Sequence, residues 1–318
     1  MKILVTGANG FVGRTLCRAL YSEQAVYAID NLRFGALRFH PSEMSRFTFI
    51  HVDIREPQQV RAVIDETRPD AIIHLAAIHF IPECENDPEL AISTNVMGTV
   101  ALLAHCPSNC RFVFASSAAV YRPDQQPLVE DRSPLGPIDV YGLTKAHSEQ
   151  YVHYLSRKRG FPAVIVRLFN VVGPGETNPH VMPTIITQLK SGRTTLKLGS
   201  ITPRRDFIHV TDTASGFVAT TLHGDVPSRE AVTVNLGTGV AHSIAQVIDL
   251  LAEISSQRIT VELDESRLRS VDNPLVVADI SKMRSTFGWR PRYDLRAALQ
   301  GTWQDPDLPD YLVGGFGG

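Results

Sequence analysis

Short apolar runs alternate with longer amphipathic stretches through the first half of the chain. The short runs, rich in Val and Ile, predict strands at 3–5, 25–29, 47–50, 71–73, 111–114 and 163–167. The longer stretches predict helices at 10–21, 57–67, 88–104 and 139–159. We expect the strands to be buried on both faces, as in a parallel sheet that helices cover on each side. The alternation predicts an α/β fold, a Rossmann-like doubly wound parallel sheet with right-handed crossovers.

The hydrophobic pattern changes after Asn170. A loop rich in Gly and Pro at 171–179 precedes a helix that begins near Val181, and an amphipathic helix follows at 243–254. We interpret residues 171–318 mainly as a smaller α+β lobe that closes over the carboxyl edge of the sheet. The two parts are interleaved, because residues 206–240 include an apolar run at 231–236 that suits a further strand of the main sheet.

Composition narrows the functions open to the chain. Of 318 residues, 31 are Lys or Arg and 33 are Asp or Glu, so the net charge is −2 and no broad basic surface is available for nucleic acid. No apolar run approaches the roughly 20 residues of a membrane span, and glycines interrupt the first apolar run too early for a signal peptide. Four cysteines make no disulfide framework, and Cys106 and Cys110 lack the partners of a zinc site. We therefore expect a cytoplasmic protein whose chemistry uses no metal.

A glycine-rich turn stands between the first predicted strand and the first predicted helix. Its glycines have a G-x-x-G-x-x-G spacing. Gly7 permits a tight turn, Gly10 lets backbone amides approach a pyrophosphate at the positive end of the helix, and Gly13 lets helix and strand pack closely. A plain strand–helix turn is the alternative. As a dinucleotide site, the turn would contact the cofactor through Gly7, Asn9, Gly10, Phe11, Val12 and Gly13.

Acidic residues after the second and third predicted strands support a dinucleotide site. Asp30, with Asn31 beside it, is placed to accept hydrogen bonds from the adenosine ribose hydroxyls, and its charge would repel a 2′-phosphate. This favours NAD over NADP, although Arg33 softens the preference. The alternative for Asp30 is a turn aspartate. Asp53 and Ile54 suit an adenine contact, while a lone Asp at that place is otherwise a helix cap.

Three side chains predict a reactive centre. Tyr141 and Lys145 form a Tyr-x-x-x-Lys pair on one helix face, where the ammonium and a positive nicotinamide ring would stabilise the tyrosine phenolate. Ser117 follows the fifth predicted strand, at the edge where open parallel sheets carry their sites. We expect Ser117 to bind the reacting oxygen and Tyr141 to act as base towards a sugar or alcohol hydroxyl. Taken singly, these features have plain alternatives, a solvated helix face and a capping serine.

With these motifs together, the sequence resembles the extended short-chain dehydrogenase/reductase family, in its NAD-dependent nucleotide-sugar epimerase/dehydratase branch. Within that branch it resembles UDP-hexose 4-epimerases, and the resemblance extends to about Pro291. It rests on segments 6–13, 74–77, 116–121, 141–145, 167–174, 205–210, 235–239 and 288–291. It implies that residues 1–170 form the NAD-binding domain and that residues 171–318 form mainly the nucleotide-sugar-binding lobe.

The resemblance also implies roles for individual residues. Ser117, Tyr141 and Lys145 would be the catalytic triad. The further residues that it implies for the cofactor site are Leu75, Ala76, Ala77, His79 and Asn95. The residues implied for the sugar nucleotide are Ser117, Ala118, Asn170, His180, Val181, Arg205, Arg269 and Asp272.

Two histidines depart from the family pattern. His79 stands where galactose epimerases have a Lys, and His180 where UDP-hexose epimerases commonly have an Asn. His79 would donate a hydrogen bond to phosphate, or it is a loop histidine with its own partners. The helices at 88–104 and 139–159 resemble those that pair in a homodimer of this family, and their apolar faces are otherwise internal.

The two positions after Ser117 distinguish the reactions of this branch. Dehydratases of the family carry an acidic residue there and 3,5-epimerising relatives a Cys, whereas this chain has Ala118 and Ala119. Without a carboxylate there is no obvious acid to protonate a departing hydroxyl. The resemblance therefore implies NAD-dependent epimerisation of a nucleotide-diphosphate hexose at C4, with a UDP-sugar favoured. An NAD(P)H-dependent 4-keto-sugar nucleotide reductase, a 4,6-dehydratase for a GDP- or dTDP-sugar, and a non-catalytic dinucleotide-binding sensor stay open.

Overall fold

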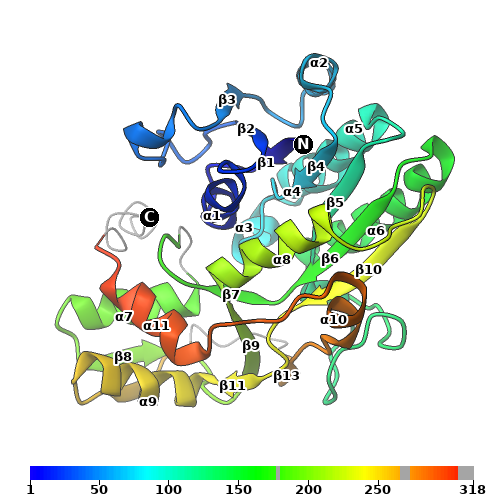
Figure 1. Cartoon of the computed structure of the whole chain (residues 1–318). Helices are drawn as coiled ribbons and strands as arrows, with labels where there is room; N and C mark the ends of the chain where they lie inside the picture. Colours follow the sequence, from blue (N-terminus) through cyan, green and yellow to red (C-terminus); the bar gives the residue numbers. More distant parts are fainter. Residues whose placement is uncertain (177–179, 266–272, 307–318) are drawn as a thin grey trace.

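The larger part of the protein is built around a parallel sheet of seven strands (Figure 1). The computed structural model describes residues 1–176, 180–265 and 273–306. The strands lie in the order β10-β6-β5-β4-β1-β2-β3, and every neighbouring pair is parallel. Their bounds are Lys2–Thr6 (β1), Ala25–Asp30 (β2), Thr48–His51 (β3), Ala71–His74 (β4), Arg111–Ser117 (β5), Ala163–Leu168 (β6) and Ala231–Leu236 (β10). The strand order reverses between β1 and β4, so a crevice is expected beyond their carboxyl ends.

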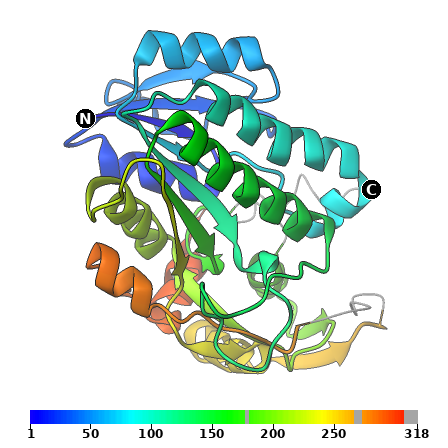
Figure 2. The same ribbon diagram turned by 90° about the vertical axis from the view of Figure 1, so that its right-hand side faces the viewer.

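Helices cover both faces of this sheet, which confirms the predicted doubly wound fold (Figure 2). On one face, α1 (Phe11–Leu20) packs against α8 (Val210–Leu222), and both bury side chains with Ile3 and Val5 of β1. On the other face, α2 (Pro57–Thr67), α5 (Gly98–His105) and α6 (Val140–Arg159) pack over Leu4 of the same strand. The side chains of successive residues of β1 thus pack alternately into the two apolar cores on opposite faces of the sheet, because side chains alternate in direction along a strand.

The expected burial of the third strand was wrong, whereas the helix expected at 88–104 is present with an irregular turn inside it. None of the four residues of β3 is buried, because β3 is the edge strand and lacks a neighbour on one side. The helix expected at 88–104 is α4 (Pro88–Ile92) and α5, joined by a π-helical turn at Ser93–Met97. A further short helix, α3 (Ile81–Asn86), precedes α4.

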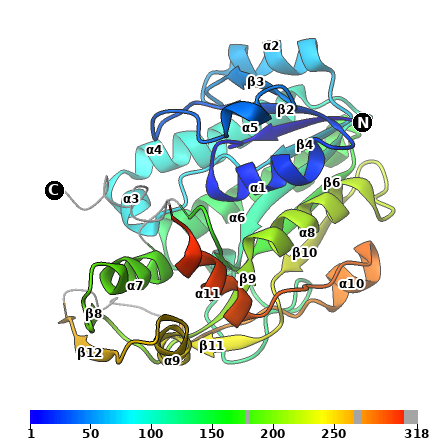
Figure 3. The same cartoon turned by 60° about the vertical axis from the view of Figure 1, so that its left-hand side comes forward.

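The remaining elements form a smaller α+β unit beside the carboxyl edge of the sheet (Figure 3). Its strands are β7 (Asn170–Val172), β8 (Thr195–Leu198), β9 (Arg204–His209), β11 (Ala241–Ser243), β12 (Thr260–Leu263) and β13 (Leu275–Val276). Its helices α7 (Val181–Lys190), α9 (Ile244–Ser255) and α11 (Leu295–Gln304) share one apolar core. The chain returns to the main sheet through α8 and β10, and again through α10 (Ser281–Phe287), which packs against β10. Among the described residues, no helix combines the length and apolar character that crossing a membrane requires.

Candidate active site

A cleft of about 1500 Å³ lies between the carboxyl edge of the main sheet and the smaller unit, and most of the predicted site residues line it. Those that line it are Gly7, Asn9, Gly10, Phe11, Val12, Gly13, Asp30, Asn31, Asp53, Ile54, Leu75, Ala76, Ala77, His79, Ser117, Ala118, Tyr141, Lys145, Asn170, His180, Val181 and Arg205. Arg269 and Asp272 lie outside the described residues. Residues far apart in the sequence therefore share one cleft.

Two glycines of the turn, Gly7 and Gly13, are packed so closely that neither has room for a Cβ atom. Gly7 has φ +68°, and a Cβ there would stand 2.7 Å from the backbone nitrogen of Ala76. A Cβ on Gly13 would stand 2.1 Å from the carbonyl oxygen of Gly7. Gly10 precedes α1, so the first amides of that helix lie at the cleft. A helix N-terminus with bare backbone around it suits a pyrophosphate, and the turn therefore fits a dinucleotide.

Asp30 ends β2 within the cleft and organises the turn beside it. Its Oδ2 accepts a hydrogen bond from the Asn9 amide (3.0 Å), and its Oδ1 accepts one from the Leu32 amide (2.9 Å). Burial raises the pKa of Asp30, and these two amide hydrogen bonds oppose that rise. Each carboxylate oxygen keeps a second lone pair, which leaves Asp30 able to accept a hydrogen bond from a ribose hydroxyl.

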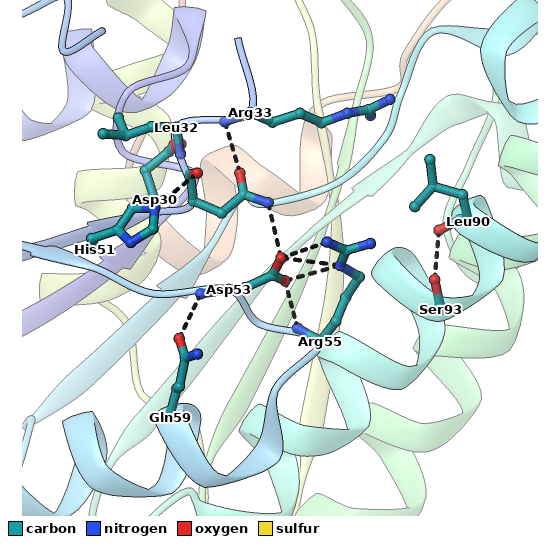
Figure 4. Close-up of polar contacts among 10 residues, drawn as sticks. Asp30, Leu32, Arg33, His51, Asp53, Arg55, Gln59, Leu90 and Ser93 are labelled. Atoms are coloured by element: carbon teal, nitrogen blue, oxygen red, sulfur yellow. Dashed lines mark hydrogen bonds and ion pairs between the residues drawn. The ribbon is translucent and has the colours of Figure 1, made fainter. Parts of the chain in front are cut away.

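Asp53 belongs to an ion pair next to Asp30 (Figure 4). Arg55 approaches its carboxylate to 2.6 Å, and the Asn31 side chain donates to the same carboxylate at 3.3 Å. The hydrogen bond from Arg55 is the main reason why the pKa of Asp53 falls to about 2. Glu56, not Asp53, is the residue before α2, so the helix-cap alternative does not describe Asp53. The carboxylate instead keeps Arg55 folded against this end of the cleft.

The three predicted catalytic side chains meet at the carboxyl end of β5. Tyr141 lies in the first turn of α6, which Asp139 caps by accepting a hydrogen bond from the Gly142 amide (2.7 Å). Ser117 lies near enough to Tyr141 for its hydroxyl to lower the tyrosine pKa, and its Oγ accepts a hydrogen bond from the Ala119 amide (3.1 Å). Lys145 is 3% exposed, and its Nζ lies 5.9 Å from the centre of the Tyr141 ring.

Burial sets the protonation of this centre when no cofactor is bound. Burial raises the pKa of Tyr141, and the hydrogen bond with Ser117 only partly offsets this. Burial also lowers the pKa of Lys145 to about 7. The Lys145 ammonium donates to the Ala115 carbonyl (2.8 Å). Without a cofactor, Tyr141 is therefore a protonated phenol at neutral pH.

A buried polar network stands behind the reactive centre and was missed from the sequence. Arg167 on β6 donates to both oxygens of Glu149 on α6, at 2.9 and 2.7 Å, and the two side chains are 5% and 3% exposed. Ser116, the neighbour of Ser117, donates to the same Glu149 carboxylate at 2.5 Å. The network fixes α6 against β5 and β6 one turn beyond Lys145. The only signal in the sequence was the position of Glu149, four residues after Lys145 and eight after Tyr141, which places the three side chains on one face of a helix.

Asn95 was expected to face the cofactor, and the structure places it behind the wall of the cleft. The side chain is 1% exposed. Its Oδ1 accepts from the Ile78 amide, and its Nδ2 donates to the Ile78 carbonyl, both at 2.8 Å. The same amide group also donates to the Thr144 hydroxyl at 3.0 Å. Asn95 therefore anchors the loop after β4 to α6, and its donors and acceptor are already used inside the protein.

Aromatic and cationic side chains also line the cleft. The ring of His180 lies 5.6 Å from that of His79 and 5.8 Å from that of Phe80. The surrounding protein, and then the charge of Lys145, lower the pKa of His79 to about 4, so the ring is neutral at pH 7. Arg205 on β9 donates to the Asn273 carbonyl (2.7 Å) and lines the cleft with a positive charge that suits a diphosphate.

Comparison with known proteins places the chain in a family. The model of the NAD-dependent epimerase/dehydratase family matches residues 3–237. A UDP-glucose 4-epimerase of Rhizobium meliloti is 31% identical, with 95% of this chain and 96% of that protein covered. A GDP-6-deoxy-D-talose 4-dehydrogenase of Aggregatibacter actinomycetemcomitans is 29% identical over 94% of this chain and 96% of its own length.

Solved structures show the same likeness. The complex of Thermus thermophilus UDP-glucose 4-epimerase with NAD has a TM-score of 0.81 at 28% identity, covering 95% of this chain and 98% of that one. The Bacillus cereus UDP-glucuronic acid 4-epimerase, in complex with UDP-glucuronic acid and NAD, has a TM-score of 0.82 at 29% identity with the same coverage. The chain belongs to the NAD-dependent epimerase/dehydratase family, and NAD is its cofactor. Within the described residues, no three His, Cys, Asp or Glu side chains gather as a metal site.

Proposed function

We propose that this family member interconverts the C4 epimers of a nucleotide-diphosphate hexose, with a UDP-sugar favoured. The observation that carries the proposal is the meeting of Ser117, Tyr141 and Lys145 at the end of β5, followed by two alanines. The similarity to UDP-glucose 4-epimerases over the whole length of the chain supports the same reaction. The glycine turn and Asp30 supply the contacts that NAD requires.

In the proposed reaction, Tyr141 transfers a proton and Ser117 binds the reacting oxygen. When bound, NAD supplies the acceptor and donor of a hydride. The positive nicotinamide ring of bound NAD would favour the deprotonated form of Tyr141. Tyr141 would then take the proton of the 4-hydroxyl, and the C4 hydrogen would leave as hydride to give a 4-keto sugar. Ser117, which lies near Tyr141, would donate a hydrogen bond to the reacting oxygen. Once the keto sugar had rotated in the cleft, return of the hydride to its other face and of the proton from Tyr141 would give the C4 epimer.

Ala118 and Ala119 favour epimerisation over elimination. Their short side chains line the cleft and leave space for a sugar ring to turn. Neither position supplies a carboxylic acid to protonate a departing hydroxyl, which a 4,6-dehydratase requires. The chemistry that this centre supports is therefore oxidation and reduction at a single carbon.

A 4-keto-sugar nucleotide reductase is the second candidate. It is favoured by the similarity to the GDP-6-deoxy-D-talose 4-dehydrogenase and, at 26% identity, to a GDP-6-deoxy-D-mannose reductase of Pseudomonas aeruginosa. The same three catalytic side chains serve that reaction. The two candidates differ in cofactor use, because an epimerase recycles its NAD and a reductase consumes NAD(P)H in proportion to product.

We also propose that the protein acts as a homodimer in the cytoplasm. The helices α4 and α6, with the π-helical turn, carry five exposed apolar side chains, namely Ile92, Met97, Leu143, Tyr151 and Tyr154. Covering such a face is a common reason for association. All four cysteines are free and buried, which fits a reducing compartment. Analytical ultracentrifugation should give a dimer for the wild type and a monomer for Tyr154→Glu, and a monomeric wild type would contradict the dimer.

Incubation with a panel of sugar nucleotides tests the reaction. The purified protein is mixed with UDP-, GDP-, dTDP- and CDP-hexoses and with UDP-glucuronate, without added cofactor, and NMR follows the configuration at C4. We expect interconversion of C4 epimers for one of them and none with Tyr141→Phe. Turnover that begins only when NAD(P)H and a 4-keto-sugar nucleotide are added would replace the epimerase with the reductase.

A further inference from the structure

Arg14 connects the glycine turn with the loop that opens the smaller unit. It lies in the first turn of α1 and is 3% exposed. One guanidinium nitrogen donates to the Asn9 carbonyl in the glycine turn (2.9 Å). The other donates to the Gly175 carbonyl in the loop after β7 (2.8 Å). A single buried cation thus joins the glycine turn to a loop that lies 161 residues beyond Arg14 in the sequence.

The same loop is held from the opposite side by the helices of the smaller unit. The Gly175 amide donates to the Asp305 carboxylate at 2.6 Å, just beyond the end of α11. Lys190, the last residue of α7, donates to the Asp305 carbonyl at 2.6 Å. A continuous path of hydrogen bonds therefore leads from the glycine turn through Arg14 and Gly175 to α7 and α11.

The loop is shaped to fit this position. Gly175 has φ +87°, which other residues rarely adopt, and a Cβ there would stand 3.0 Å from an Arg14 guanidinium nitrogen. Gly173 has φ +153°, and its Cβ would stand 2.6 Å from Val210 of α8. The loop is thus packed closely between α1 and α8, and a change in the position of Arg14 is transmitted to Gly175 rather than absorbed by empty space.

We propose that Arg14 is a positioning residue that couples the binding of NAD at the glycine turn to the order of the smaller, sugar-nucleotide-binding unit. The inference rests on the proposed function for the roles of the two sites. A pyrophosphate bound to the amides of the turn fixes the Asn9 carbonyl, which fixes Arg14 and through it Gly175, Asp305 and the ends of α7 and α11. Because coupling is reciprocal, a closed smaller unit also slows the loss of NAD. A cofactor that must remain through oxidation and reduction is retained by this contact.

The test compares Arg14→Met with Arg18→Met, a matched control on the same helix. Arg18 pairs with Glu43 at the surface and does not form the bridge to Gly175. Hydrogen exchange by mass spectrometry is measured with and without NAD⁺, on peptides from the glycine turn and from residues 181–198 and 295–304. In the wild type and in Arg18→Met, NAD⁺ should protect all three. In Arg14→Met the glycine turn should stay protected, the other two peptides should lose the effect, and NAD⁺ should dissociate about tenfold faster.

A second variant covers the case in which Arg14→Met does not fold. Asp305→Asn weakens the path from the other end, and it should also remove NAD-dependent protection of residues 181–198 while the glycine turn remains protected. Equal NAD-dependent protection of the smaller unit in both Arg14→Met and Arg18→Met would overturn the coupling and leave the proposed function intact. Bound NAD is removed from each protein before the comparison. If NAD⁺ then protects the glycine turn of the wild type but not the other two peptides, the coupling falls, whereas the proposed function is decided separately by the panel of sugar nucleotides.

Discussion

Breaking the buried ion pair behind the reactive centre should destabilise the protein far more than breaking an exposed one. Arg167→Met keeps most of the side-chain volume but leaves the Glu149 carboxylate, 3% exposed, without its cationic partner. Loss of one member of a buried pair costs about 3–5 kcal/mol of unfolding free energy. Arg167 also stacks on Tyr121, with 4.6 Å between the guanidinium and the ring centre, so the change removes a packing contact as well. We expect the full cost to fall in the upper half of that range.

Urea unfolding followed by tryptophan fluorescence measures this cost, because Trp289 packs in the main core and Trp303 in the smaller unit. Arg61→Met is the control, since Arg61 and Asp65 form a pair at 3.4 Å with 68% and 69% exposure. It should cost less than about 1 kcal/mol. Adding Glu149→Gln to Arg167→Met removes the unpaired charge and should return about 1–3 kcal/mol. A cost for Arg167→Met no larger than that for Arg61→Met would refute the reasoning.

Three further predictions follow from the site. Tyr141→Phe should abolish turnover and leave NAD binding within about threefold of wild type, because the phenol oxygen moves a proton but does not hold the cofactor; isothermal titration and the NMR assay check this together. Burial lowers the pKa of Lys145 to about 7, so above pH 7 the unfolded chain binds a proton that the cofactor-free folded chain does not. The free energy of unfolding, relative to that of Lys145→Met, should therefore rise between pH 7 and 10 by up to about 1.4 kcal/mol per pH unit. A difference in urea midpoints that does not change with pH would contradict this. Asp30→Ala removes the carboxylate that would meet a 2′-phosphate and should improve NADP⁺ binding relative to NAD⁺ by about tenfold or more; an unchanged ratio of dissociation constants would show that Asp30 does not select the cofactor.

The sequence predicted those parts of the structure that depend on local pattern. Five of the six predicted strands are buried where apolar runs indicated, and the glycine turn has the close contacts that its spacing required. β3 is also an apolar run but lies at the edge of the sheet, and the pattern of a single strand does not reveal its place in the strand order. The π-helical turn at Ser93–Met97 likewise inserts no unusual residue that marks it in advance.

The contacts missed from the sequence join distant segments. Asn95, Glu149 and Arg14 each use their polar atoms on partners between 5 and 161 residues away, and no local motif reveals such partners. The pKa of Tyr141 in the cofactor-free protein was also not evident from the sequence, because the Tyr–Lys spacing is visible there whereas burial is not. Burial decides the sign of that pKa shift, so the sequence placed the catalytic residues together without fixing their charge state.

Tracing the hydrogen at C4 tests the central claim most directly. The sugar nucleotide that the panel identifies is prepared with deuterium at C4 and incubated with the purified protein in ordinary water, without added cofactor. The proposed reaction predicts that the C4 epimer forms and retains deuterium at C4, because the same hydride leaves and returns on the bound NAD. Loss of the deuterium to water, or an epimer that forms only when NAD(P)H is supplied, would contradict it.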